Sequence, residues 1–237
     1  GLLIAASVPC TLAAASVWTR KAGGNDAISL LVTLTTSLAC FLTTPFWLSV
    51  PTFLSSISTF GADLAAQVTL TPETRYKLGV DLILGALLPT LFGQLLRQQL
   101  GVRCWADRKK PFLGAISQGL ILLMVLVASI KAGVRLAETQ DRSFGAIPFL
   151  VVFTSVILIH ILAFYAGTFL SRKLGFSLGD QVAVGLAGSQ KTLPTGLLIA
   201  TELGQATGMT FALFPMLMYH AAQLLIDTLF VSTYARR

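Results

Sequence analysis

Long stretches without a charged residue alternate with short polar segments along the whole chain. Most of these stretches approach or exceed the roughly 20 apolar residues that cross a bilayer as an α-helix. None shows the alternation of polar and apolar positions that is typical of a β-strand. The pattern therefore predicts an all-α polytopic membrane protein. The uncharged stretches cover Gly1–Thr19, Ala27–Ala62, Leu82–Leu96, Pro111–Ile130, Ser143–Ser171 and Leu203–Ile226.

Interpreted as helices, the apolar stretches predict seven membrane-spanning segments. Two of them, Gly1–Arg20 and Gln181–Thr201, are rich in Gly, Pro and hydroxyl residues, so we expect them to be interrupted. The segment Pro51–Tyr76 is rich in Ser, Thr and Gly and either extends a helix or lies along the membrane interface. Five continuous spans are expected at Ala27–Val50, Lys77–Leu100, Ala115–Ala132, Ile147–Arg172 and Met209–Ala235.

The composition agrees with this class. Of 237 residues, 54% are hydrophobic and only 11% are charged, whereas soluble domains carry about 25% charged residues. The mean hydropathy is +0.78. Lipid is therefore the expected solvent for most of the chain, in a bacterial inner membrane or a plasma membrane.

The net charge of +7 is explained by topology rather than by a nucleic-acid partner, because all but one of the basic residues lie between apolar segments. On alternate sides of the seven segments, one side receives eleven Lys and Arg residues and the other five. The positive-inside rule then predicts a cytoplasmic C-terminus. The richer side carries Arg20, Lys21, Arg97, Arg103, Arg108, Lys109, Lys110, Arg172, Lys173, Arg236 and Arg237.

Chemistry-bearing motifs of enzymes are missing from the sequence. The motifs of zinc proteases, α/β-hydrolases and nucleotide-binding enzymes do not occur. The three cysteines, Cys10, Cys40 and Cys104, are too scattered for a disulfide framework or a metal site. We expect no enzymatic activity and no cofactor.

The two interrupted segments resemble each other in composition. Pro9–Ser16 leads into the polar linker Trp18–Asp26, and Gly185–Gly196 leads into Leu197–Gly204; each is followed by a long continuous span. Matched discontinuous helices are typical of inverted-repeat transporters, where freed backbone groups bind ions and substrate near the membrane midplane. The alternative is that these small residues only permit close helix packing.

Lys191 is the one basic residue inside an apolar segment. A charge at membrane depth costs at least about 2.5–3.5 kcal/mol and usually faces a cavity or a partner. Its neighbours Ser189, Gln190 and Thr192 supply the donors and acceptors of a hydrated site. The alternative is a structural salt bridge, with Asp227 as the nearest carboxylate by depth.

Two histidines lie near the middle of predicted spans. His160 and His220 are candidate proton-relay or cavity-lining groups. The alternative for each is a simple hydrogen bond to a neighbouring helix.

Several motifs resemble the bile acid/sodium symporter (BASS) superfamily, in particular the SBF-like branch that includes the seventh member of solute carrier family ten. They are Pro9 with Thr19-Arg20, Gly23-Gly24-Asn25-Asp26-Ala27, Leu88-Pro89 with Gly93 and Arg97, and Gly188-Ser189-Gln190-Lys191-Thr192-Leu193. The resemblance covers the whole chain as the last seven spans of a ten-span inverted-repeat fold. It implies an N-terminally truncated fragment, which also fits the start at Gly1 without Met. Residues 1–76 would hold the last two spans of the first repeat plus a connector, and residues 77–237 the complete second repeat.

The resemblance also implies two broken helices that cross near the substrate and sodium sites. Sodium-coupled members carry a Ser-Asn pair and a Glu at positions that correspond here to Ala15-Ser16 and Leu186. Lys191 therefore either replaces a bound sodium ion or exchanges a proton. Candidate sodium ligands that remain are Ser29, Thr33 and Gln190.

The sequence thus predicts a secondary transporter that moves an organic anion or a sterol-like solute by alternating access, coupled to Na⁺ or H⁺. One alternative is a non-transporting membrane regulator of ion or calcium homeostasis on the same scaffold. A seven-span receptor is the other, and the paired broken segments argue against it. The predicted substrate and ion site comprises Thr11, Ser16, Ser29, Thr33, Ser189, Gln190, Lys191 and Thr192.

Overall fold

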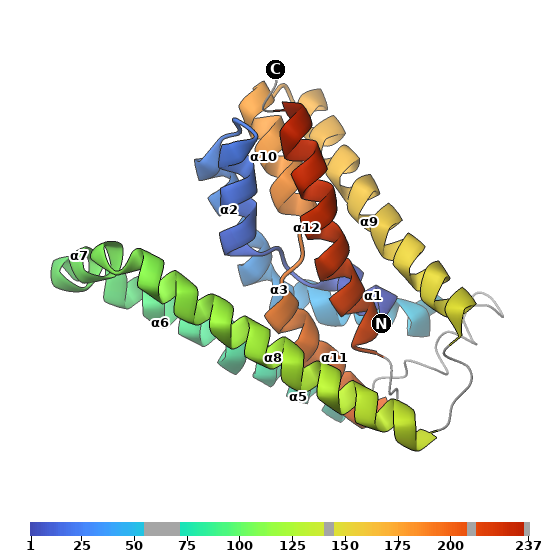
Figure 1. Cartoon of the computed structure of the whole chain (residues 1–237). Helices are drawn as coiled ribbons and strands as arrows, with labels where there is room; N and C mark the ends of the chain where they lie inside the picture. The colour runs from blue at the N-terminus through green and yellow to red at the C-terminus, as the bar shows by residue number, and fades with distance from the viewer. Residues whose placement is uncertain (55–71, 140–144, 208–211, 235–237) are drawn as a thin grey trace.

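The computed structural model describes residues 1–54, 72–139, 145–207 and 212–234, and every regular element in these ranges is a helix (Figure 1). The all-α prediction is thereby confirmed for this part of the chain. The helices are α1 (Leu2–Ser7), α2 (Leu12–Lys21), α3 (Asp26–Leu54), α5 (Pro72–Leu82), the π-helical turn η1 (Ile83–Leu87), α6 (Leu88–Arg97), α7 (Leu100–Arg108), α8 (Lys110–Thr139), α9 (Ala146–Lys173), α10 (Leu178–Ser189), α11 (Leu193–Thr207) and α12 (Phe214–Tyr234).

Five stretches of helix in the described part of the chain are long and apolar enough to cross a membrane. They correspond to the five spans predicted to be continuous, and the protein is an integral, multi-pass membrane protein. The predicted arrangement of ten spans in two repeats, divided at residues 76 and 77, stays a prediction. The candidate spans are Asp26–Val50, Gly79–Arg97, Lys110–Val127, Ala146–Lys173 and Phe214–Tyr234.

The two segments predicted to be interrupted are pairs of short helices, α1 with α2 and α10 with α11. Val8 has the extended conformation (φ −69°, ψ 153°) that a following proline, here Pro9, favours. Gln190 is also extended (φ −73°, ψ 145°), and Pro194 has no N–H to donate to its carbonyl group. Each break therefore has a local cause in a proline.

The core forms around the broken helices. Helix α10 packs against α9, α3 and α2, and α12 packs against α9, so that these helices form one bundle in Figure 1. The core contains the fully buried side chains of Ile199 on α11 and of Met216 and Tyr219 on α12. Close packing of α9 and α10 is possible because Gly167 and Gly185 face each other without side chains.

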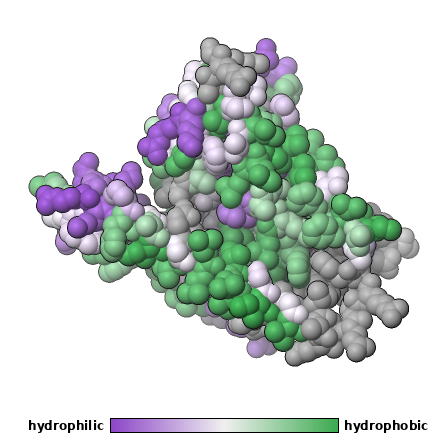
Figure 2. Space-filling view, in the orientation of Figure 1, coloured by the Kyte–Doolittle hydropathy of each residue, from purple (hydrophilic) through white to green (hydrophobic). Residues whose placement is uncertain are grey.

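The helices from α5 to α8 extend away from this bundle, with α7 at the far end (Figure 1). The spans Gly79–Arg97 and Lys110–Val127 bury none of their residues within the described structure. Figure 2 shows a continuous apolar surface along α8 and a hydrophilic end at α7. Lipid contact explains both features, because apolar helix faces are stable in a bilayer and basic residues are stable at its surface.

One predicted span differs from the observed helices. Lys77–Leu100 was expected to be one regular span, but the π-helical turn η1 separates α5 from α6. Pro89 is the second residue of α6, and it has no N–H to donate to the carbonyl group of Gly85, which lies four residues earlier within the turn. Of the uncertain segment Pro51–Tyr76, the residues 55–71 lie outside the described ranges, as does the predicted start of the last span at Met209.

Candidate substrate and ion site

The first break, between α1 and α2, and the second break, between α10 and α11, lie in direct contact, and we call this place the crossing. The backbone N–H of Thr192 donates a hydrogen bond to the carbonyl oxygen of Pro9, with 2.9 Å between N and O. The Lys191 ammonium donates to the carbonyl oxygen of Val8 at 3.1 Å. Backbone groups that helices would otherwise satisfy therefore pair across the crossing.

The carbonyl group of Ser189, at the end of α10, is held by two buried side chains. Tyr219 of α12 donates its hydroxyl group to this oxygen at 2.7 Å, and Nδ1 of His160 of α9 lies 3.2 Å from it. Because a carbonyl oxygen only accepts, Nδ1 of His160 carries a proton. The Ser189 hydroxyl donates to the carbonyl oxygen of Leu186 and is fully buried.

Asp227 is the hub of a second set of contacts. Its carboxylate accepts from Nε2 of Gln190 at 2.6 Å and lies 2.9 Å from Nε2 of His160, and all three side chains are fully buried. The suggested salt bridge between Lys191 and Asp227 is wrong for the described structure: the Lys191 ammonium donates to the carbonyl oxygen of Val8, and the Asp227 carboxylate pairs with Gln190 and His160 instead. The Oε1 atom of Gln190 is buried and has no partner in the described structure.

The side-chain amide of Gln223 on α12 bonds to both backbone polar groups of Lys191, its N–H and its carbonyl group. Its Oε1 atom accepts from the Lys191 N–H at 2.8 Å, and its Nε2 atom donates to the Lys191 carbonyl oxygen at 3.1 Å. The same Nε2 atom lies 3.0 Å from Nδ1 of His220. His220 thus contacts the second break through Gln223.

The predicted site residues near α2 and α3 form a separate group. Ser16 donates to the Asp26 carboxylate, Thr33 donates to the carbonyl oxygen of Ser29 at 2.9 Å, and Thr11 precedes α2 without a side-chain capping bond. The Ser29 hydroxyl is fully buried and has no described partner.

The candidate sodium ligands lie at different depths. Helices α3 and α10 begin side by side, since the Asn25 N–H donates to the Gly179 carbonyl oxygen at 2.9 Å. Ser29 lies about 6 Å and Gln190 about 17 Å along the helices from that junction, at 1.5 Å per residue. The unpartnered oxygens of Ser29 and Gln190 suit a cation individually, but this separation does not suit a single ion.

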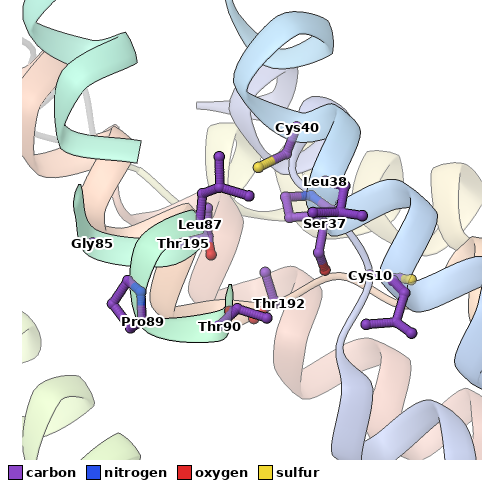
Figure 3. A pocket seen from close by; sticks show the side chains of 12 residues that line it. Cys10, Ser37, Leu38, Cys40, Gly85, Leu87, Pro89, Thr90, Thr192 and Thr195 are labelled. Atoms are coloured by element: carbon purple, nitrogen blue, oxygen red, sulfur yellow. The ribbon is translucent and has the colours of Figure 1, made fainter. Parts of the chain in front are cut away.

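A cavity of about 260 Å³ lies between the crossing and the helix that runs from α5 to α6. Figure 3 shows Ser37, Leu38 and Cys40 of α3 facing it from one side and residues of η1 and α6 from the other. Of the predicted site residues, only Thr192 lines it. Within the described part of the chain, its lining contains no charged side chain and consists of Pro9, Cys10, Leu34, Ser37, Leu38, Cys40, Gly85, Leu87, Pro89, Thr90, Thr192 and Thr195.

Sequence reasoning missed two kinds of residue here. The contacts of Tyr219, Gln223 and Asp227 with the second break were not predicted, although a polar residue at every fourth position of an apolar helix was a usable signal. The cavity residues Ser37 and Thr195 carried no comparable signal, because single hydroxyl residues are common in membrane helices.

Broken helices that meet at membrane depth, beside a cavity in a polytopic α-helical protein, are the arrangement typical of secondary transporters. The chain belongs to the SBF-like CPA transporter family, whose sequence model matches residues 1–236. The resemblance to the SBF-like branch of the BASS superfamily is thereby confirmed.

Three known proteins from different organisms are similar to this chain. The chain is 31% identical to the uncharacterized protein PA2026 of Pseudomonas aeruginosa, with 100% of this chain and 66% of that protein covered. It is 30% identical to the Arabidopsis thaliana protein named "Probable sodium/metabolite cotransporter BASS4, chloroplastic" (100% and 52% covered). It is 27% identical to sodium/bile acid cotransporter 7 of Xenopus tropicalis (98% and 63% covered). The chain therefore spans between about half and two thirds of these relatives.

Proposed function

We propose that this protein is a secondary transporter that moves an organic anion or a sterol-like solute by alternating access. The observation that carries the proposal is the crossing itself, where the Lys191 ammonium donates to the carbonyl oxygen of Val8 while the adjacent residues Pro9 and Thr192 line the cavity. The names of relatives, which include sodium/bile acid and sodium/metabolite cotransporters, support the same class.

Lys191 would recognise the anionic group of the solute. Among the described residues, its side chain donates to a single backbone carbonyl oxygen, that of Val8, and an ammonium group has three donors. Helices α2 and α11 both begin close to the crossing, and helix N-termini favour negative charge. An anion that enters the crossing would therefore meet a cation and two favourable helix ends.

The cavity would hold the uncharged body of the solute. Its lining combines apolar side chains, such as Leu34 and Leu87, with the hydroxyl groups of Ser37, Thr90 and Thr195. Such a lining suits a rigid apolar molecule with a few polar groups.

Transport would be coupled to Na⁺ or H⁺. The buried, unpartnered oxygens of Ser29 and Gln190 support cation binding, with Thr33 one turn from Ser29. His160, which is fully buried, and Lys191, which is partly buried, are groups at the crossing that could hold a proton. A gradient of either ion would supply the free energy of uptake.

Uptake of tritiated taurocholate, an anionic sterol, into proteoliposomes tests this function under a sodium gradient, a proton gradient or neither. We expect uptake that depends on one gradient and is lost in Lys191→Ala. Lys173→Ala is the matched control, because Lys173 is an exposed lysine beside Phe169 at the end of α9. Normal uptake and ion dependence in Lys191→Ala would show that the role given to Lys191 is wrong.

A further inference from the structure

The side-chain amide of Gln223 replaces the helical hydrogen bonds that the second break loses. It accepts from the N–H of Lys191 at 2.8 Å and donates to the carbonyl group of the same residue at 3.1 Å. Gln223 is fully buried on α12. One side chain thus satisfies both backbone groups of Lys191 and holds it between α10 and α11.

Hydrogen-bond valence determines the orientation of this amide. The N–H of Lys191 can only donate, so the atom that faces it is the oxygen of Gln223. The NH₂ group of Gln223 then has one hydrogen for the Lys191 carbonyl oxygen and one for Nδ1 of His220, 3.0 Å away. Nδ1 of His220 must therefore accept, which makes His220 a neutral imidazole with its proton on Nε2.

We propose that Gln223, oriented by neutral His220, is a positioning residue that fixes the backbone of Lys191 and so directs its ammonium group to the crossing. This inference rests on the proposed function, since it assigns a role in recognition of the anionic solute. The relay runs from His220 through Gln223 to Lys191, with a hydrogen bond at each step.

The relay is sensitive to protonation. A proton on Nδ1 of His220 would place an N–H against the NH₂ group of Gln223. Rotation of the amide would relieve that contact but would reverse both bonds to Lys191. The NH₂ group of Gln223 would then face the Lys191 N–H, and the amide oxygen would face the Lys191 carbonyl oxygen, so neither pair could form a hydrogen bond.

Other titratable groups near this relay have partners of their own. From α9, His160 pairs with Asp227 of α12, and Tyr219 of α12 donates to Ser189. The Lys191 ammonium donates to Val8. Among the contacts of the described residues, His220 is therefore the titratable side chain that faces Gln223.

Kinetics of taurocholate uptake test the positioning role. Gln223→Leu is expected to raise KM by about tenfold, as expected for the loss of one or two net hydrogen bonds, with a smaller effect on kcat. His220→Leu is expected to act in the same direction. His220→Asn keeps an acceptor near the position of Nδ1 and is expected to lose far less. Thr228→Val, an exposed position on α12, is the control.

The pH profile separates this role from a purely structural one. Uptake by the unmodified protein is expected to fall as the pH is lowered below neutrality, because protonated His220 opposes the Gln223 amide. Gln223→Glu places a carboxylate where protonated His220 can donate, so this decline should be lost. An unchanged KM in Gln223→Leu, or the same acid decline in Gln223→Glu, would overturn the inference.

Nitrogen NMR of the purified protein with ¹⁵N-labelled histidine provides a readout that needs no transport. The chain contains two histidines, so His160→Gln assigns the remaining signals to His220. We expect an unprotonated Nδ1 and a protonated Nε2 on His220, and a changed Nδ1 signal in Gln223→Leu. A proton on Nδ1 at neutral pH would overturn the relay even if uptake is normal. Absence of uptake with the expected NMR result would instead overturn the proposed function alone.

Discussion

Individual buried polar residues stabilise the second break, because each satisfies a backbone or side-chain group that the interrupted helix leaves without a partner. Tyr219, Gln223 and Asp227 are one helical turn apart on α12 and contact three consecutive residues of the break. Asp227 supports two of these contacts at once, since it accepts from Gln190 and pairs with His160. It is therefore the residue whose loss should affect the break most.

Asp227→Leu tests this at the level of stability. The substitution leaves Nε2 of His160 and Nε2 of Gln190 buried without an acceptor, and loss of one partner of a buried pair typically costs about 3–5 kcal/mol. We expect a clear decrease in the melting temperature of the purified protein in detergent. Thr228→Val, at the next and exposed position, should change it little. Equal melting temperatures for Asp227→Leu and the unmodified protein would contradict this account.

Asp180 gives a pH-dependent prediction at the other end of α10. The Ser177 hydroxyl, and after it the Asn25 amide, hold the pKa of Asp180 below its ordinary value of 3.8, and both lie 2.7 Å from its carboxylate. A carboxylate whose pKa is lowered by folding stabilises the folded state at every pH above its ordinary pKa. This contribution is lost as the pH falls through the pKa of the folded state. The unmodified protein should therefore melt above Asp180→Asn at neutral pH.

Melting curves from pH 7 to pH 3 measure that contribution. The difference between the two proteins should shrink as the pH falls below 3.8, because the carboxylate becomes protonated in both states. A difference that is constant over the whole range would show that the Asp180 contacts act without its charge.

At the level of helices, the close contact of α9 with α10 depends on glycine. A Cβ atom on Gly185 would lie 2.5 Å from Cγ2 of Thr168 and 3.1 Å from the ring of Phe164. Gly185→Ala should therefore force the two helices apart and lower the melting temperature, by an amount within the 1–3 kcal/mol range typical of overpacking. Gly188→Ala on the same helix is the control, because a Cβ atom there would meet no other described atom within 4 Å. A larger loss in Gly188→Ala would contradict the contact.

Sequence reasoning succeeded for helices where lipid alone determines the pattern. The span at Ile147–Arg172 was predicted within one residue at each end, as α9 (Ala146–Lys173), because apolar length is a sufficient signal. The break at Lys191 was also detectable, from a charge in an apolar segment followed by Pro194. The partners of Asp227 could not be predicted from the sequence, because the depth of a residue in the membrane does not determine which face of its helix meets which neighbour. The cavity was missed for the same reason: Ser37 and Thr90 face it only through the rotation of α3 and α6.

For the whole molecule, the cavity lies where the helix that runs from α5 to α6 meets α3 and the crossing. Helices α5 and η1 pack against α3, and α5 packs against α11, so the cavity is enclosed by the crossing on one side and the α5–α6 helix on the other. Alternating access requires that such parts separate on one side of the site at a time. Contacts that join α5 to α11 away from the cavity would then control its access.

The ion pair between Lys77 of α5 and Glu202 of α11 is such a contact, with 2.6 Å between Nζ and the carboxylate. Lys77 is about 12 Å along the helix from Gly85 of the cavity, and Glu202 is about 10 Å from Thr195, at 1.5 Å per residue. Lys77→Glu places two carboxylates together and should separate α5 from α11 at this end. In a Cys104→Ser background, we expect several-fold faster maleimide labelling of Cys10 and Cys40, which line the cavity.

The double variant Lys77→Glu/Glu202→Lys restores an ion pair with reversed polarity, so it should return the labelling rate to that of the unmodified protein. Arg108→Glu reverses a charge on α7, far from α11 (Figure 1), and should leave the rate unchanged. Exposed ion pairs contribute little to stability, so melting temperatures should stay nearly equal while labelling changes. Faster labelling that the double variant fails to reverse would mean that Lys77→Glu opens the cavity by local damage rather than by releasing α5 from α11.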